Sequence, residues 1–268
     1  MRHHKIFLLS FIFIASCQTS KKTTKENTQP SSMMFGAKLY TAFYQQQAAE
    51  YKALCFQSYM LAKSALDAAM VNGTSLPAAI VTDIDETVLD NSMYAVKRAL
   101  EEKEYSLESW HDWTGRSLAD TLAGALTFFN YAKSRGAEIY YISNRDETER
   151  DGTLKNLQKF GFPDSDNEHL LLKQGTSSKE PRRLQVAEKH SIVLYIGDNL
   201  ADFNILFDKK TTEERNQNMM KLHAAFGYQY IILPNPFYGD WEGSTFKYNY
   251  GLTPAQKDSV IRTVLHSY

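Results

Sequence analysis

The spacing of hydrophobic residues changes several times along the chain, and each change marks an expected element. From residue 37 to 70, apolar side chains recur at helical spacing among polar ones, without a glycine or proline break. This pattern predicts a long helix that ends before Gly73. Further stretches with helical spacing, interrupted or closed by glycine, predict helices within 93–131, 148–160 and 181–189.

Short apolar runs lie between these helical segments. They are too short for helices and are followed by polar or turn-forming residues, as is typical of buried strands. Strands are expected at 77–81, 138–142, 169–172, 191–196 and 228–233. Strands that alternate with helices predict an α/β fold, with a doubly wound, mostly parallel sheet. The helical segments outside this alternation, about 35–70 and 93–128, are expected to form a smaller helical domain over the site.

Polar side chains follow several of the predicted strands. Asp83 and Asp85 come directly after the first strand, and Ser143 and Asn144 follow the second. Asp198 follows the fourth strand. In a doubly wound sheet, ligands bind beyond the carboxyl ends of the strands. We therefore expect these side chains to line one site.

The spacing of Asp83 and Asp85 indicates a specific chemistry. Residues two apart in an extended segment face the same way, so both carboxylates would point into one site. Their repulsion would protonate one of them unless a divalent cation were present, and Asp198 offers the hard oxygen ligand that Mg²⁺ prefers. Ionised Asp83 could then attack phosphorus to form an aspartyl-phosphate. Asp85 could donate a proton to the leaving oxygen and later accept one from water.

Other polar residues could hold the phosphate. Ser143 and Asn144 offer a hydroxyl and an amide as donors, and Lys179, just before a predicted helix, could bring a positive charge. Each signal alone is common on ordinary protein surfaces. Their order is informative: Asp-x-Asp-x-Thr, Ser-Asn, Lys and Gly-Asp-Asn-x-x-Asp follow one another along the chain.

These motifs resemble the four-motif signature of the haloacid dehalogenase superfamily of phosphotransferases. The closer resemblance is to its bacterial class C nonspecific acid phosphatases, the lipoprotein e type, and it runs from about Tyr51 to Glu242. It is carried by the segments 83–92, 141–145 and 195–203, with shorter matches at 50–54, 110–113 and 233–242. The family often has two acidic residues after Gly-Asp-Asn-Leu, whereas this chain has Ala201 followed by Asp202.

The resemblance implies a metal-dependent acid phosphatase that hydrolyses nucleoside monophosphates and other small organic phosphates. It implies Asp83 as nucleophile and Asp85 as acid and base. The metal, Mg²⁺ or another divalent cation, would be held by the carboxylates of Asp83 and Asp198 and by the backbone carbonyl of Asp85. The remaining assignments are phosphate binding for Ser143, Asn144 and Lys179, and support of the metal or of Lys179 by Asp202.

Aromatic residues and alternative functions remain open at this level. Trp110, Trp113 and Tyr238 could stack on a substrate ring, although each could equally be ordinary packing. One alternative function is a surface lipoprotein that binds a nucleotide or haem. Haem would require well-placed histidines, and none of the seven forms a recognised spacing. The other alternative, phosphoryl transfer to an alcohol, shares the chemistry of hydrolysis.

The first seventeen residues have the order of a secretory signal: a basic start, an apolar run at 6–14 and small residues before Cys17. That run is too short to span a bilayer, which needs roughly 20 residues. The segment also resembles a lipobox, which implies a lipid on Cys17, although an ordinary signal peptide is the alternative. We therefore expect a signal peptide at 1–17, a polar flexible tether at 18–34 and a phosphatase domain at 35–268.

Charge and cysteine content limit the partners. The chain has 30 Lys and Arg against 31 Asp and Glu, a net charge of −1, which lacks the basic excess typical of binding to nucleic-acid polymers. With Cys17 lipidated, only Cys55 would remain, so no intramolecular disulfide is expected. The expected partners are a small phosphomonoester and a membrane outside the cytoplasm. Gln18 favours the outer membrane, and the oligomeric state, a homodimer included, is left open.

Overall fold

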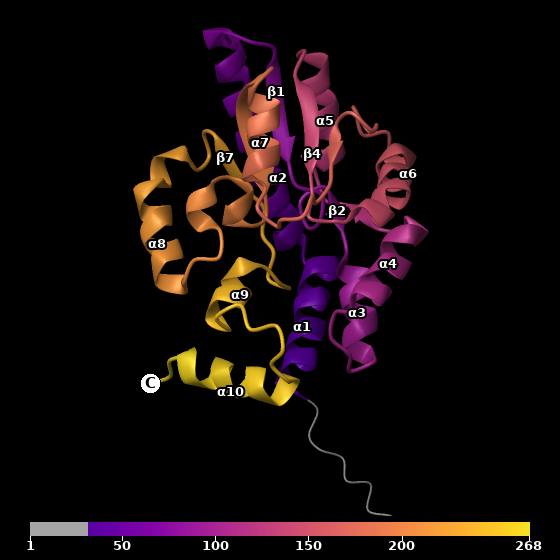
Figure 1. Ribbon diagram of the computed structural model, residues 1–268, viewed down its shortest axis with the longest axis vertical. Coiled ribbons are helices and arrows are strands. Elements are labelled where there is room, and N and C mark those ends of the chain that lie inside the picture. Colours follow the sequence, from indigo (N-terminus) through magenta and orange to yellow (C-terminus); the bar gives the residue numbers. More distant parts are fainter. Residues whose placement is uncertain (1–31) are drawn as a thin grey trace, which may run out of the picture. The chain divides into compact units, whose positions relative to one another are not determined.

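The computed structural model describes residues 32–268 (Figure 1). Cys17 and the predicted signal peptide lie outside the described residues. Residues 32–268 contain a five-stranded sheet in the order β5-β4-β1-β6-β7, in which every neighbouring pair is parallel. Its strands are β1 (Ala78–Thr82), β4 (Glu138–Ile142), β5 (Leu170–Leu171), β6 (Ser191–Gly197) and β7 (Tyr230–Ile232). The predicted α/β fold with a mostly parallel sheet is confirmed.

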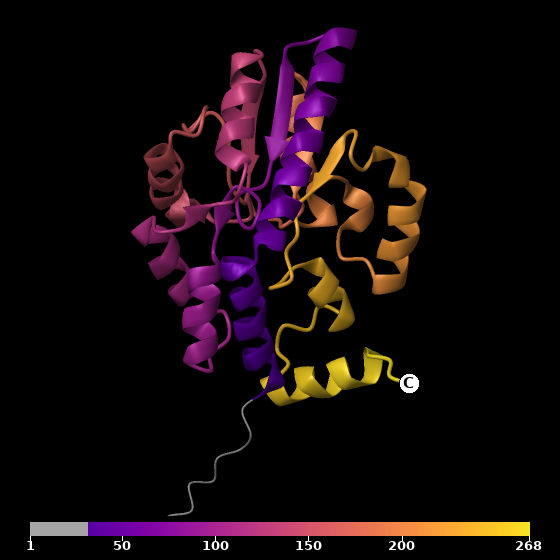
Figure 2. The ribbon, with the colours of Figure 1, turned by 180° about the vertical axis from the view of Figure 1, so that it is seen from behind.

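Helices cover both faces of this sheet (Figures 1 and 2). On one face, α2 (Ala49–Asn72), α5 (Ala125–Ser134) and α6 (Arg150–Phe160) enclose the larger apolar core, which includes the fully buried Leu66, Phe129 and Leu157. On the other face, α7 (Glu180–Ala187) packs on β4 and β6 over a smaller apolar cluster. Both faces of the strands are therefore buried, as the continuous apolar runs of the sequence indicate.

The strand order places a topological switch point between β1 and β6. From β1 the chain proceeds outward to β4 and β5, and it then returns to the other side of β1 to form β6 and β7. Connections leave the sheet in opposite directions at such a point and open a crevice beyond the strand ends. The pairing continues past β1, where the N–H of Asp83 donates to Ile196 O at 2.9 Å.

Further helices lie beyond the carboxyl ends of the strands, beneath the sheet in Figure 1. Here α1 (Met33–Gln47) packs against α3 (Ser92–Leu100) and α10 (Pro254–Val264). Ser32 Oγ and Met33 N donate to Asp258 of α10 at 2.7 and 3.0 Å. None of the helices within 32–268 has both the length and the apolar character needed to cross a bilayer. The remaining helices are α4 (Leu107–Arg116), α8 (Thr212–Lys221) and α9 (Asp240–Thr245). Short 3₁₀ helices are η1 (Glu147–Glu149), η2 (Leu200–Asp202), η3 (Ile205–Phe207) and η4 (His223–Ala225).

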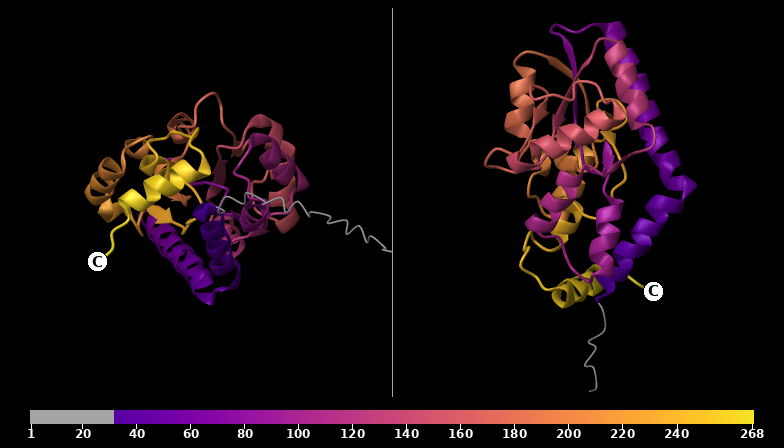
Figure 3. Two further views of the ribbon diagram at one scale, coloured as in Figure 1. Left: turned by 90° about the horizontal axis from the view of Figure 1, so that it is seen from below. Right: turned by 90° about the vertical axis from the view of Figure 1, so that its right-hand side faces the viewer.

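The long helix predicted for 37–70 is two helices. Ala48 lies between α1 and α2 in an extended conformation (φ −78°, ψ 125°), which produces the bend seen at the right of Figure 3. The bend lets α2 pack on the sheet while α1 packs on α3. Because Ala48 is an excellent helix former, no local signal marks the break. Helix α1 also begins at Met33, so residues 33 and 34, which the predicted tether includes, are helical.

The predicted helical stretch 93–131 is also divided. It contains α3, α4 and part of α5, separated by loops and by β3 (Asp120–Thr121), which pairs antiparallel with β2 (Leu89–Asp90). Gly115 lies inside α4, and the helix ends at Ser117, which is left-handed (φ 54°). Gly124 does interrupt the pattern, since it adopts φ 90° just before α5. Strands of two residues are too short to show a period of their own.

Candidate functional site

A cavity of about 500 Å³ lies beyond the carboxyl ends of β1, β4 and β6. Helices α1, α3, α4, α9 and α10 contribute the remaining walls. The sequence-predicted residues among its lining are Asp83, Asp85, Trp110, Ser143, Asn144, Lys179, Asp198, Asp202 and Tyr238. Residues far apart in the sequence thus meet at the switch point of the sheet.

Lys179 lies between two carboxylates. Its Nζ is 2.6 Å from Asp83 Oδ1 and 2.7 Å from Asp202 Oδ1, and all three side chains are largely buried. Burial alone would lower the pKa of Lys179, but the two carboxylates outweigh burial and raise it. Burial also raises the pKa of Asp83 to about 6, with Asp202 and Asp85 adding to the rise and Lys179 opposing it. The lysine is therefore a charged, fixed group beside Asp83.

The turn after β6 is built around a close approach. The backbone N–H of Asn199 donates to Asp202 Oδ2 at 2.9 Å, which folds the Asp202 side chain back against Gly197. A Cβ on Gly197 would lie 2.6 Å from the Cβ and 2.7 Å from the Cγ of Asp202, closer than packed atoms come. Position 197 must therefore be glycine, because the side chain of Asp202 occupies the space that a Cβ there would need.

Asp198 is held by two side-chain donors. Thr87 Oγ1 donates to its Oδ1 at 3.2 Å, and Asn235 Nδ2 donates to its Oδ2 at 2.7 Å. Burial, followed by the charges of Asp202 and Asp83, raises the pKa of Asp198 well above its ordinary value, and Asn235 opposes the rise. The Asp198 carboxylate is therefore oriented but lacks a neighbouring positive charge of its own.

Asp83, Asp198 and Asp202 form a carboxylate set that fits a divalent cation. One ligand oxygen from each lies within 4.8 Å of the others. Burial, and next the charges of the neighbouring carboxylates, raise the pKa values of both Asp83 and Asp198, and a cation bound among the three would offset that negative charge. An all-oxygen donor set of this kind suits a hard divalent metal. The Asp85 carboxylate is not in this set.

Asp85 instead forms an ion pair that sequence reasoning missed. Arg145, whose side chain is 1% exposed, reaches Asp85 Oδ1 through NH2 at 2.7 Å and both carboxylate oxygens through Nε. Arg145 NH1 donates to Thr153 Oγ1 at 2.9 Å, and Asn91 Nδ2 donates to Asp85 Oδ1. The arginine directly after Ser-Asn was a visible signal, but nothing in the sequence identified its partner.

Glu86 is a buried carboxylate in a strained position. It has φ 54° and accepts from Asn91 N at 2.9 Å and from the Tyr238 hydroxyl. Burial, and next the charge of Asp85, raises the pKa of Glu86 to about 8. Tyr238 is thus tied to the Asp-x-Asp loop by its hydroxyl while its ring lines the cavity. Trp113, which does not line the cavity, donates from Nε1 to Asn91 Oδ1 at 2.8 Å.

Ser143 and Asn144 are held by an arginine from α7. Arg182 donates from NH1 to Ser143 O at 2.6 Å and from NH2 to Asn144 Oδ1 at 2.8 Å. Burial lowers the pKa of Arg182 to about 10. Because the amide oxygen of Asn144 is engaged, its N–H₂ group is the part that can donate to a ligand. The Ser143 Oγ accepts from Arg145 N at 3.1 Å, which leaves its hydroxyl proton to donate.

Comparisons with known proteins bear on the family of this chain. Residues 9–241 match the family model of the HAD superfamily, subfamily IIIB (acid phosphatase). The chain is similar to solved structures of the class C acid phosphatase from Bacillus anthracis. One has a TM-score of 0.85 at 42% identity and covers 88% of this chain and 99% of that one. The other, with tungstate bound, has a TM-score of 0.84 at 42% identity and covers 87% and 98%.

Two curated plant proteins are more distant relatives. Acid phosphatase 1 of Solanum lycopersicum is 26% identical over 172 residues, or 59% of this chain and 57% of that protein. The stem 31 kDa glycoprotein of Glycine max is 29% identical over 125 residues, or 44% and 49%. The match therefore spans about half the length of these two relatives. The family model and the shared fold confirm the resemblance seen in the sequence: the chain belongs to subfamily IIIB, the acid phosphatases, of the HAD superfamily.

Proposed function

We propose that the protein hydrolyses phosphate monoesters through an aspartyl-phosphate intermediate, with Asp83 as nucleophile and Asp85 as general acid and base. The observation that carries this proposal is the different environment of the two carboxylates. Asp83 lies beside Lys179 and the carboxylate set, whereas Asp85 is held by Arg145. Two neighbouring carboxylates with distinct environments are suited to distinct roles.

The reaction has two steps. First, the Asp83 carboxylate forms a bond to phosphorus while the bond from phosphorus to the leaving oxygen breaks, and Asp85 gives that oxygen its proton. Second, Asp85 takes a proton from water, whose oxygen attacks phosphorus and releases Asp83. The sum is one ester and one water converted to one alcohol and one phosphate. Arg145 positions Asp85 in both steps through its paired hydrogen bonds.

The phosphoryl oxygens would be bound by donors that the structure has already oriented. Lys179, the Asn144 amide and the Ser143 hydroxyl lie in the same cavity. A divalent cation held by Asp83, Asp198 and the Asp85 carbonyl, with Asp202 as a further carboxylate in reach, would neutralise charge between the phosphate and its nucleophile. We propose Mg²⁺, because oxygen ligands dominate the set. Tungstate, a tetrahedral oxyanion like phosphate, is bound in the Bacillus anthracis relative.

The substrates we propose are nucleoside monophosphates and other small organic phosphates. Trp110 and Tyr238 present ring surfaces in the cavity, and a nucleobase offers a flat π-face for stacking. The cavity volume of about 500 Å³ suits a ligand of this size. The segments 35–70 and 93–128, of which α1, α3 and α4 line the cavity, would act as the smaller helical domain that selects the leaving group.

We further propose that Cys17 carries a lipid and becomes the N-terminus after removal of the residues that precede it, and that residues 18–34, apart from the helical end at 33–34, tether the enzyme to a membrane outside the cytoplasm. The apolar run, the small residues before Cys17 and the polar composition that follows support this. Gln18 supports the outer membrane.

Exposed aromatic residues on α1 and α2, among them Tyr40, Phe43 and Phe56, support a homodimer, which light scattering would test.

The decisive experiment follows release of p-nitrophenol from p-nitrophenyl phosphate with and without EDTA. We expect EDTA to abolish turnover and Mg²⁺ to restore it. In Asp83→Asn we expect less than about one hundredth of the activity, because an amide cannot attack phosphorus. Mass spectrometry of acid-quenched wild-type enzyme should show one added phosphoryl group, absent from Asp83→Asn. A protein that binds nucleotide without turnover would instead support the binding-lipoprotein alternative.

Added methanol separates hydrolysis from phosphotransfer. A hydrolase should release mainly inorganic phosphate, whereas a phosphotransferase should form mainly methyl phosphate from the same intermediate. The ratio of these two products, measured by phosphorus NMR, decides between the two functions without changing the assignment of Asp83.

A further inference from the structure

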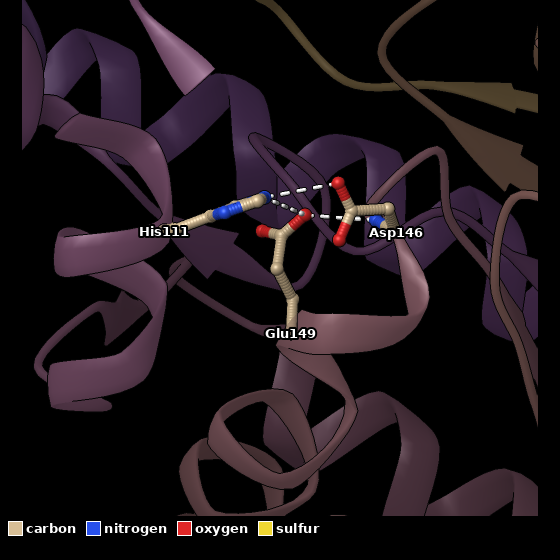
Figure 4. A group of neighbouring side chains, drawn as sticks. All are labelled: His111, Asp146 and Glu149. Carbon is tan, nitrogen blue, oxygen red and sulfur yellow. Dashed lines mark hydrogen bonds and ion pairs between the residues drawn. The ribbon is translucent and has the colours of Figure 1, made fainter. Parts of the chain in front are cut away.

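A second set of metal-ligand side chains lies outside the active-site cavity. His111 comes from α4, Asp146 is the N-cap of η1, and Glu149 is the last residue of η1 (Figure 4). His111 Nε2 is 2.9 Å from Asp146 Oδ2 and 3.9 Å from Glu149 Oε2. One ligand atom from each of the three lies within 4.8 Å of the others. None of the three lines the catalytic cavity.

The backbone of η1 orients both carboxylates. The Thr148 N–H donates to Asp146 Oδ1 at 3.2 Å, and the Asp146 N–H donates to Glu149 Oε2 at 2.8 Å. The Thr148 hydroxyl donates to Asp146 Oδ1 as well. Each carboxylate therefore has one oxygen held by the chain. Metal-binding carboxylates are commonly fixed in this way by hydrogen bonds from the surrounding residues.

The Glu149 carboxylate is left incompletely satisfied. Glu149 is 3% exposed, and among residues 32–268 no donor makes a well-formed hydrogen bond to its buried Oε1, although the Thr114 hydroxyl lies close enough to favour the charged carboxylate. The proton of the Thr114 hydroxyl, in the facing helix α4, is already engaged within that helix. It is directed to the backbone oxygens of Trp110, at 3.1 Å, and His111, at 3.4 Å. A buried acceptor without a donor costs about 1–3 kcal/mol. The Oε2 atom of this carboxylate faces His111 and Asp146, and a cation held there by both carboxylate oxygens would also give Oε1 its missing partner (Figure 4).

We propose that His111, Asp146 and Glu149 form a second metal site, of the kind that binds Zn²⁺. An imidazole nitrogen with two carboxylates is a donor set that Zn²⁺ accepts, and tetrahedral geometry places neighbouring ligand atoms about 3.4 Å apart. The separations of His111 Nε2 from Asp146 Oδ2 and Glu149 Oε2, 2.9 and 3.9 Å, lie on either side of that value. The His111 and Asp146 side chains are 33% and 24% exposed, which leaves an open side for a water ligand and for entry of the ion.

The site would join two parts of the molecule that meet at the active site. Helix α4 carries Trp110 into the cavity, and the loop that precedes η1 carries Ser143, Asn144 and Arg145. A metal bound by His111 and Asp146 would clamp α4 to this loop. The alternative is that these residues bind no metal. His111 would then only contact the two carboxylates, and Asp146 would only cap the 3₁₀ helix η1.

Zinc binding can be measured separately from the catalytic metal. Metal-free protein is saturated with Mg²⁺ and titrated with Zn²⁺, and bound zinc is counted by elemental analysis after equilibrium dialysis. X-ray absorption then reports the ligands. No histidine of residues 32–268 lines the catalytic cavity, so imidazole scattering from zinc identifies a different site. We expect one zinc per chain with one imidazole ligand.

Three variants decide the location. His111→Asn and Glu149→Gln should each weaken zinc binding at least about tenfold, since even supporting residues of metal sites change affinity by 10–100-fold. Glu149→Gln keeps an oxygen that can accept from Asp146 N, so it serves if His111→Asn fails to fold. His223→Asn, at an exposed histidine of η4, is the matched control and should bind zinc as wild type does.

Zinc should also raise the melting temperature of wild-type protein but not of His111→Asn, because ligand binding to the folded state stabilises it. The proposal is overturned if Mg²⁺-saturated wild type binds no zinc, if bound zinc shows no imidazole, or if both site variants bind zinc with wild-type affinity. Hydrolysis of p-nitrophenyl phosphate by the Mg²⁺ enzyme is scored separately, so failure of the zinc site leaves the proposed function untouched.

Discussion

Replacement of Gly197 by alanine adds one methyl group at a crowded turn of the candidate site. The new Cβ would lie 2.6 Å from the Cβ and 2.7 Å from the Cγ of Asp202. Asp202 cannot turn away freely, because Lys179 and the Asn199 N–H hold its two oxygens. Either the β6 turn or the Asp202 side chain must therefore move.

The cost can be estimated from these contacts. Overpacking a well-packed site costs about 1–3 kcal/mol. Loss of the hydrogen bond from Asn199 N to Asp202 adds about 0.5–1.5 kcal/mol. A total of about 2–4 kcal/mol should lower the melting temperature by about 5–15 °C in a domain of this size. Since Asp202 positions Lys179 beside Asp83, a shift of about 1 Å should lower kcat by about a hundredfold.

The matched control is Gly115→Ala. Gly115 lies inside α4 with no atom within 4 Å of the position of a new Cβ, and its φ is not positive. Alanine there should leave kcat unchanged and stabilise the protein by up to about 1 kcal/mol. Both variants are measured by thermal denaturation and by steady-state hydrolysis of p-nitrophenyl phosphate.

A double-mutant cycle tests the cause. If the clash with Asp202 destabilises Gly197→Ala, the destabilisation should be much smaller in an Asp202→Gly background, which removes the Cβ as well as the carboxylate, so the two changes should be strongly non-additive. Additive effects would show that alanine strains the turn by another route. A Gly197→Ala enzyme with wild-type melting temperature and kcat would refute the steric argument altogether.

Three further changes have expected outcomes. Asp85→Asn should slow formation of the aspartyl-phosphate more for a nucleoside monophosphate than for p-nitrophenyl phosphate, whose leaving group needs less protonation, and equal losses in a pre-steady-state burst would contradict its role as general acid. Cys17→Ser should move the protein from the membrane to the soluble fraction on centrifugation, and a variant that still sediments after a salt wash would place the anchor elsewhere. His169 has a raised pKa, because the hydrogen bond with Asp166 outweighs the opposing effect of burial. Its ion pair should therefore stabilise the fold fully below about pH 6.5 and lose that effect as pH rises through the raised pKa, so melting curves of His169→Gln should fall below wild type in acid but converge with it in alkali.

The sheet could be predicted because each strand shows its burial in the sequence. The apolar run 138–142 coincides with β4, and 191–196 ends one residue before β6 does. Since parallel strands end at one edge, the polar residues after these runs had to meet there, and Asp83, Ser143 and Asp198 do line one cavity. The roles assigned to them remain predictions.

Contacts between individual side chains could not be predicted. Arg145 pairs with Asp85 sixty residues earlier, and Tyr238 with Glu86 across 152 residues. Such pairs depend on how loops close over the sheet, which leaves no periodic pattern in the sequence. The bend at Ala48 is similar, because tertiary packing overrides the helix propensity of alanine. Elements of two or three residues, such as β2 and β3, fall below the length at which a period is visible.

The pairing of β2 with β3 has a consequence for how this enzyme can diversify. Leu89 lies opposite Thr121 and Asp90 opposite Asp120, so the chain leaves the sheet domain and returns to it at the same place. The intervening segment 91–119 carries α3 and α4, which supply Tyr94 and Trp110 to the cavity wall. Because strand pairing holds the two ends of this segment together, insertions or deletions within it cost little loop-closure entropy and leave β1 undisturbed. Exchange of this segment between relatives would therefore change the part of the cavity wall that it supplies, while β1 and Asp83 stay as they are.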